Sequence, residues 1–209
     1  MNTFKSKRLS LAAAALTLPL IASAASTVTT GTGTLTATAT VNFTVVVPQY
    51  LYLRIGTGSS YTTGAFTTVS TTDLITFSPA VGAVGNGTAV AGTGGDLAGG
   101  VETAAVLGNG GNVTLTAAAT GPLTDSAGDT IPFTQITTAA AANTTTYSTL
   151  AAPALSNTST SETVTATNKV VKADAKWTFS YANSTAVPAG TYGGTTALNG
   201  IVTYTASMP

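Results

Sequence analysis

The 209-residue sequence contains neither cysteine nor histidine. Without cysteine the chain forms no disulfide, has no thiolate nucleophile and offers zinc no sulfur ligand. Without histidine it lacks the commonest general base, the commonest metal ligand and the usual partner of a catalytic serine. We therefore expect no enzyme, no cofactor and no transition-metal site.

Charge is scarce as well, since only 7% of the residues are Asp, Glu, Lys or Arg, against about 25% in an average globular protein. Lys5, Lys7 and Arg8 are three of the seven basic residues, so residues 25–209 keep four basic and seven acidic residues, a net charge of −3. No basic patch is available to neutralise phosphates, and we expect no nucleic-acid partner. The surface must consist largely of Thr, Ser, Asn, Gly and Ala, which leaves little charge repulsion between molecules.

Residues 1–24 have the order of a secretory signal peptide. The basic residues precede an apolar run from Leu9 to Ile21, and small residues follow at 22–24. The run is too short to cross a membrane, and no later stretch is long enough, so we expect no integral membrane segment. The sequence predicts cleavage after Ala24 and export to the periplasm, the cell surface or the extracellular space.

Residues 35–47 carry the most regular pattern in the chain, with an apolar residue at every second position. The apolar positions are Leu35, Ala37, Ala39, Val41, Phe43, Val45 and Val47. A period of two predicts a β-strand with one apolar face. Because that face needs a groove, we expect residues 25–47 to act as an N-terminal strand that mediates assembly. The strand would be either the first strand of its own sheet or a donor strand given to a neighbouring copy.

The remaining sequence predicts short strands separated by turns, with no amphipathic helix. The predicted strands are residues 50–55, 74–77, 101–107, 112–118, 131–136, 162–171, 177–181 and 201–208. Within 162–171 we expect a turn or bulge near Asn168 and Lys169. Residues 108–111 are Gly and Asn, which tolerate positive φ and predict a tight hairpin between the third and fourth of these strands. Residues 137–161 are low in complexity, and we expect a loop there, with the alanines at 139–142 as a weak helix start.

These strands predict a single all-β domain over residues 25–209, an immunoglobulin-like antiparallel β-sandwich with Greek-key topology. A closed β-barrel is the alternative, because strand count and alternation do not distinguish the two folds. Trp177, Phe179 and Tyr181 alternate, and Trp177 is the only tryptophan. We expect these three aromatic residues to anchor the core.

Three further patterns bear on binding sites. Asp125 and Asp129 lie in a turn sequence that permits calcium, although it does not match the twelve-residue calcium loop and is ordinary turn composition. The acidic residues from which a glycosidase would take its carboxylate pair are Asp73, Asp96, Glu102, Asp125, Asp129, Glu162 and Asp174. The aromatic residues that could stack on a sugar are Tyr50, Tyr52, Phe66, Tyr147 and Tyr181.

The signal peptide, the alternating residues 34–47 and the C-terminal segments 190–192 and 201–208 together resemble bacterial fimbrial subunits and related immunoglobulin-like surface proteins. Fimbrial subunits of the chaperone–usher kind are incomplete sandwiches, and the alternating N-terminal extension of one subunit completes the next. The resemblance implies an exported structural subunit of a surface filament or extracellular matrix. Its implied partners are copies of itself or other surface subunits, and a periplasmic chaperone.

The chain departs from that family in lacking a cysteine pair and in ending with Met208 and Pro209 rather than with a penultimate aromatic residue. Residues 188–192 and 202–206 also look like the closing hairpin of cell-wall-binding β-domains. The alternative function is therefore a secreted glycan-binding or adhesion module of the cell surface.

Overall fold

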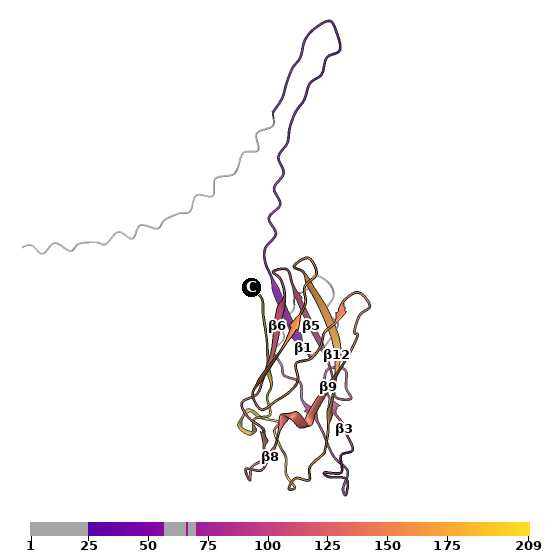
Figure 1. Ribbon diagram of the computed structural model, residues 1–209, viewed down its shortest axis with the longest axis vertical. Coiled ribbons are helices and arrows are strands. Elements are labelled where there is room, and N and C mark those ends of the chain that lie inside the picture. The colour runs from indigo at the N-terminus through magenta and orange to yellow at the C-terminus, as the bar shows by residue number, and fades with distance from the viewer. Residues whose placement is uncertain (1–24, 57–65, 67–69) are drawn as a thin grey trace, which may run out of the picture. The chain divides into compact units, whose positions relative to one another are not determined.

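The computed structural model describes residues 25–56, 66 and 70–209 (Figure 1). The predicted signal peptide, residues 1–24, lies outside the described residues. By its internal contacts the chain divides into two units, Met1–Val47 and Pro48–Pro209. We call the second unit the body.

The described part of the first unit, residues 25–47, is an extended segment that bends at residues 31–33. Thr29 Oγ1 donates a hydrogen bond to the carbonyl of Thr36 at 3.1 Å across this bend. All of residues 25–47 are exposed, and none of them belongs to a strand. The strand predicted over residues 35–47 is thus not formed within the single chain, because a strand requires a paired neighbour. We call residues 25–47 the extension.

The body is all-β apart from two short 3-10 helices in its described residues, as predicted, and its largest sheet has six strands. These strands are β1 (Leu51–Ile55), β3 (Val90–Ala91), β5 (Val101–Gly108), β9 (Ile136–Ala141), β10 (Ser148–Thr149) and β12 (Val171–Tyr181). The second sheet has the order β11-β6-β13, with β6 (Val113–Ala118) between β11 (Ser159–Val164) and β13 (Thr203–Ser207). The smaller elements are the pair β2 (Ile75–Thr76) and β4 (Thr93–Gly94), the pair β7 (Leu123–Thr124) and β8 (Thr130–Ile131), and the helices η1 (Phe133–Gln135) and η2 (Thr196–Leu198).

Strand β12 organises the six-stranded sheet. On one side it pairs antiparallel with β5 and, further along, with β3. It also pairs with β9, antiparallel, and with β10, parallel. Strand β1 pairs antiparallel with β5 and ends the order on that side. The second sheet is antiparallel throughout, since β6 pairs antiparallel with both β11 and β13.

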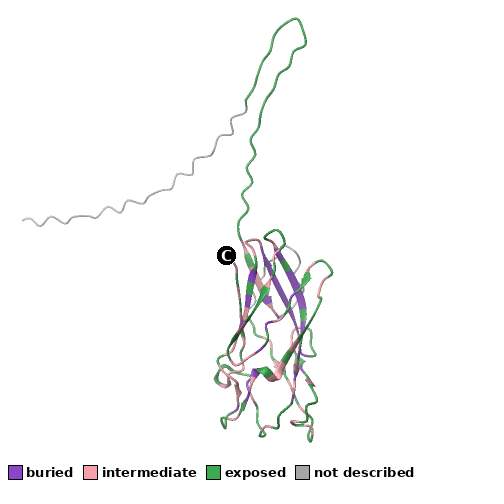
Figure 2. Ribbon diagram, viewed as in Figure 1, coloured by how far each residue is buried: buried purple, intermediate pink, exposed green. Residues whose placement is uncertain are grey.

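The core lies between the inward faces of these two sheets, which gives the body a sandwich-like arrangement. Buried residues (purple in Figure 2) concentrate on β5, β6 and β12. Trp177 is fully buried; its indole Nε1 donates to the carbonyl of Leu150 at 2.8 Å, and its ring lies 5.5 Å from that of Tyr204. Phe179 and Tyr181 are each only 6% exposed. No sheet among the described residues closes into a barrel, so the alternative fold is wrong.

The hairpin predicted across residues 108–111 is wrong. Strand β5 lies in the six-stranded sheet and β6 in the three-stranded sheet, so these residues carry the chain from one sheet to the other. Asn109 fastens this crossing to the start of β1, since its side chain accepts from the Tyr50 amide and donates to the Pro48 carbonyl, both at 2.8 Å. Residues that tolerate positive φ suit a change of sheet as well as a tight turn.

Three other predicted segments differ from the structure. Residues 137–161 contain most of β9, all of β10 and the start of β11, and the alanines at 139–141 lie in β9 instead of starting a helix. Residues 162–171 contain the turn predicted near Asn168 and Lys169, both of which have positive φ, but this turn separates two strands, β11 and β12, and does not interrupt a single one. Residues 131–136 divide among β8, η1 and β9.

Candidate functional site

The predicted assembly residues all lie on the exposed extension. Phe43 is 89% exposed and Val45 84%, and Leu35, Val41 and Val47 are exposed as well. Ala37 and Ala39 complete the row and are also exposed. A row of apolar side chains in water favours association with any surface that covers it.

The body presents a half-covered apolar row at one sheet edge. Strand β13 pairs only with β6 among the described strands. Its inward side chains pack against the core yet keep intermediate exposure, and they are Val202, Tyr204, Ala206 and Met208. Strand β1 lies beside β13, and its Leu53 and Ile55 pack against the same core with similar exposure. Gln49 Nε2 donates to the Pro209 carbonyl at 2.8 Å, which ties the start of β1 to the end of the chain.

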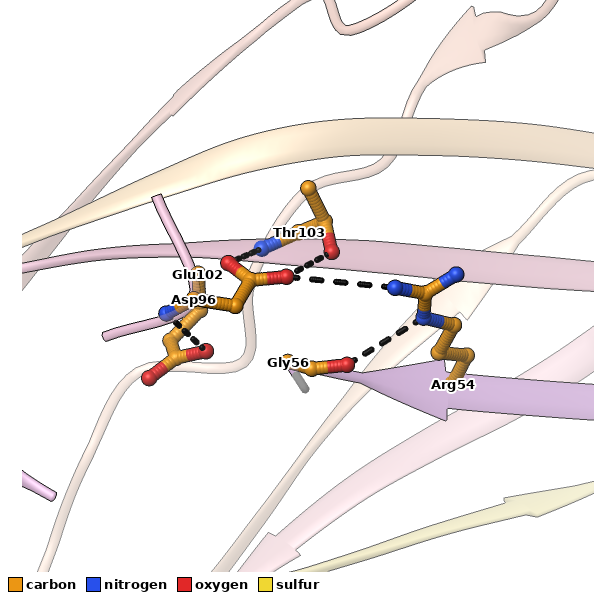
Figure 3. Close-up of polar contacts among 5 residues, drawn as sticks. All are labelled: Arg54, Gly56, Asp96, Glu102 and Thr103. Carbon is orange, nitrogen blue, oxygen red and sulfur yellow. Dashed lines mark hydrogen bonds and ion pairs between the residues drawn. The ribbon is translucent and has the colours of Figure 1, made fainter. Parts of the chain in front are cut away.

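A buried polar cluster lies at the junction of β1 and β5 (Figure 3). Arg54 is 7% exposed; its Nε donates to the Gly56 carbonyl at 3.1 Å and its Nη2 lies 4.0 Å from Asp96 Oδ2. The carboxylate of Asp96 also accepts from Thr103, from the amide at 2.8 Å and from the hydroxyl. Asp96 thus joins the loop before β5 to both strands.

Glu102, which is 5% exposed, adds a second carboxyl group to this cluster and accepts from the Asp96 amide at 3.4 Å. Burial is the main reason that the pKa of Glu102 is raised from 4.5 to about 8, and the nearby negative charges of Asp73 and Asp96 raise it further. Glu102 therefore holds a proton at neutral pH. A Cβ added at Gly56, whose φ is +67°, would collide with the carboxyl groups of both Glu102 and Asp73.

The arrangement of these acids is that of a structural network. The cluster brings together Asp73, Asp96 and Glu102 from the seven acidic residues. A glycosidase needs two carboxyl groups across a cleft that admits a sugar. The described residues include a pocket of about 220 Å³ lined by Ser148, Thr149, Ala151 and residues 162–165, and it contains none of the three clustered acids.

Asp125 and Asp129 form a turn between β7 and β8. Asp125 Oδ1 accepts from the amides of Ala127 and Asp129, both at 2.9 Å, and the Asp125 amide donates to the Asp129 carbonyl at 3.1 Å. One of the two carboxylate oxygens of Asp125 is thus engaged with the turn backbone. Within the described ranges, no group of three or more acidic side chains is placed to hold a metal ion.

The structure brings together three of the five aromatic residues considered for sugar binding. The Phe66 ring lies 5.3 Å from Tyr50 and 4.9 Å from Tyr52, with tilts of 39° and 41°. Tyr181 is instead buried, with its ring 6.3 Å from that of Phe77. Tyr147 directly precedes β10, at the opposite edge of the sheet from β1.

Asn183 is a fully buried residue that sequence reasoning missed. Its side-chain amide donates to the carbonyl of Ala83 at 2.7 Å and to Asn86 Oδ1 at 3.2 Å, and its oxygen accepts from the Gly85 amide at 2.7 Å. The signal in the sequence was a lone Asn two residues after the last aromatic residue of a core strand. It holds the loop that precedes β3 to the end of β12.

No family model matches the chain, and neither does any curated protein or solved structure. The helices in the described part of the chain are all too short to cross a membrane.

Proposed function

We propose that this protein is an exported structural subunit of a surface filament or extracellular matrix, and that its copies assemble by β-strand complementation. The observation that carries the proposal is the extension, in which every residue of the alternating apolar row is exposed to solvent. In the same proposal the body is an immunoglobulin-like sandwich of Greek-key topology, and copies of the chain or other surface subunits supply the complementary edge. A periplasmic chaperone would cover the row before assembly.

The body supports this proposal because it has an extensive core of its own. The residues that form the core cluster belong to Pro48–Pro209, and they include the fully buried Trp177 and Leu115. We therefore expect residues 48–209 to fold as a unit, which the deletion below tests.

The chemistry of the extension also suits a strand added to another chain. Residues 25–47 contain no charged residue and no proline. Charges and prolines are the usual devices by which proteins prevent strand addition at exposed edges. The polar row between the apolar positions consists mainly of threonine, a residue that favours strands.

Size-exclusion chromatography and thermal melting of residues 25–209 and of residues 48–209 test the proposal. We expect the longer chain to form concentration-dependent oligomers, and the shorter chain to be a monomer with a similar melting temperature. If the longer chain stays monomeric at high concentration and the deletion lowers the melting temperature, the extension serves its own fold and the filament proposal fails.

A matched pair of variants separates the apolar row from general charge effects. Phe43→Asp with Val45→Asp places two charges in the apolar row, whereas Thr40→Asp with Thr44→Asp places two charges in the polar row. We expect the first pair to abolish oligomers and the second to retain them. Equal loss in both would show that charge alone, rather than a facing groove, controls assembly.

A second candidate function is glycan binding by the exposed aromatic group at β1. It is favoured by the contact of Phe66, which is 52% exposed, with Tyr50 and Tyr52. The mutual tilt of the rings, however, gives a packed cluster more than a flat platform for a sugar. Glycan-array binding that is lost in Phe66→Ala and kept in the Phe43→Asp, Val45→Asp variant would favour this function over assembly.

A further inference from the structure

We infer that the extension of one copy adds as a new strand along the outer edge of β13 in a second copy. This inference rests on the proposed assembly function and identifies the acceptor surface. The three-stranded sheet β11-β6-β13 would become a four-stranded sheet in the complex. The occupant is residues 35–47 of another molecule of the same chain.

The exposure pattern of β13 is that of an edge with a missing neighbour. Its outward residues are exposed, while the inward residues Tyr204 and Ala206 reach the core and are still only half-buried. Val202 and Met208 continue this row beyond the two ends of the strand. A neighbouring strand with apolar residues at every second position would cover these four side chains.

The other edge of the same sheet is protected against strand addition. In β11, Glu162 pairs with Leu115 of β6, and Leu115 is fully buried in the core, so Glu162 belongs to the inward row. An inward-pointing charge on an edge strand penalises the burial that a new strand would bring. At the corresponding place in β13 the residue opposite Leu115 is Ala206. The two edges therefore differ in a feature that opposes strand addition at β11 and is absent from β13.

The edges of the six-stranded sheet are weaker acceptors. Strand β10 has only two residues. In β9 the residues opposite Tyr181, Phe179 and Trp177 are Ile136, Thr138 and Ala140. Of these three, only Ile136 has a large apolar side chain. Strand β1 has an apolar inward row and lies beside β13, so it is part of the proposed acceptor surface and not a separate acceptor. A strand added at β13 would therefore also approach Leu53 and Ile55.

The polar row of the extension matches the outward row of β13. The outward residues of β13 are Thr203, Thr205 and Ser207, and the extension places Thr or Asn at each even position from 36 to 44. Pairs of Thr and Ser across neighbouring strands form hydrogen bonds and stabilise the sheet. Neither row carries a charge, so no like charges oppose each other.

Disulfide trapping tests the inference cleanly because the chain has no cysteine of its own. One set of copies carries a single cysteine in the extension, at Thr40, Asn42 or Thr44, which are alternate positions on the polar row. The partner copy carries Thr205→Cys. Its matched control carries Ser161→Cys, since Ser161 and Thr205 both lie opposite Thr116 on the two sides of β6 and are both exposed.

We expect a mixed disulfide, identified by mass spectrometry of the linked peptides, between Thr205→Cys and at least one of the three extension positions. A disulfide needs the two Cα atoms within about 7 Å, which strand neighbours satisfy. Yields with Ser161→Cys should be at least tenfold lower. Oligomers that form normally but link through Ser161→Cys, or through neither position, would overturn the inference and leave the assembly proposal standing. Absence of oligomers in the unmodified chain would instead refute the assembly proposal itself.

Discussion

Raising the pH from about 5 to about 9 should destabilise the body through Glu102. Its carboxyl group is buried near the junction of β1 and β5, with Asp73 and Asp96 as negative neighbours, and its negative charge helps to raise the pKa of the Tyr204 phenol. Arg54 faces Asp96 in the same cluster. The folded chain therefore holds a proton on Glu102 that the unfolded chain releases at much lower pH.

The sign follows from proton binding. The pKa of Glu102 is about 8 in the folded chain and 4.5 in its ordinary state. Below about pH 4.5 both states are protonated, and the contribution of Glu102 is fully present; between about 4.5 and 8 only the folded state keeps the proton, so the free energy of unfolding falls as pH rises. If the whole difference between these two pKa values acted on stability, the free energy of unfolding would fall by about 5 kcal/mol. Because water entry and relaxation screen the ionised carboxylate, we expect a loss of about 2 kcal/mol.

Urea unfolding of residues 25–209 at several pH values, followed by Trp177 fluorescence, measures this loss. Glu102→Gln keeps the shape of the side chain and removes its titration, so the variant should lose less stability than the parent chain across this pH range and become the more stable of the two at high pH. The difference between the two curves isolates Glu102 from all other titrating groups. Parallel curves for parent and variant would refute the reasoning.

Three further measurements have defined expected results. Trp177→Ala should cost about 3–5 kcal/mol of unfolding free energy in urea titrations, since it empties a fully buried site and removes the hydrogen bond to Leu150; a cost under about 1 kcal/mol would show that the site collapses without loss. Asn183→Ala should lower the free energy of unfolding by about 1–3 kcal/mol and speed hydrogen exchange at the Gly85 amide, because this amide loses its acceptor. Unchanged exchange at Gly85 would mean that the loop keeps its conformation without Asn183. Secreted protein should begin at Ala25 by N-terminal sequencing, and material that begins at Met1 would remove the case for export.

Local alternation was enough to predict the fold class and the burial of the aromatic strand. In residues 177–181 and 113–118 the inward positions can be read directly from the period of two, and the structure buries Trp177, Val113 and Leu115. Such a pattern depends only on neighbours in sequence. It can therefore be recognised without knowing which strands pair with one another.

Sheet membership could not be read in the same way. Strands β5 and β6 have the alternation and the glycine-rich connection of a hairpin, yet they pair with strands far along the chain. Which sheet each strand joins depends on the sum of packing across the core and not on the connecting residues. For the same reason Ala139 to Ala141 became part of β9, because the backbone of β12 offered a partner to residues with little preference of their own.

The polar cluster was beyond sequence reasoning because its members are scattered. Asp73, Asp96 and Glu102 were visible only as isolated acids, and the fold brings Arg54 of β1 within 4.0 Å of Asp96. Only the composition hinted at it, since Arg54 is the single arginine after residue 24. An arginine in an otherwise apolar strand predicts a buried partner.

The pairing of β12 also determines when the protein can fold. Trp177 lies opposite Glu102, and Tyr204 lies opposite Ala117, so both sheets remain incomplete until the last quarter of the chain is present. Contacts between residues this distant in sequence make folding slow, on the millisecond to second scale or longer. A nascent chain of this kind stays open while it is being made, and the proposed export would use that open state. Until β12 and β13 arrive, the earlier strands carry unpaired edges and bare apolar faces, and this is the interval in which the chain is most exposed to aggregation.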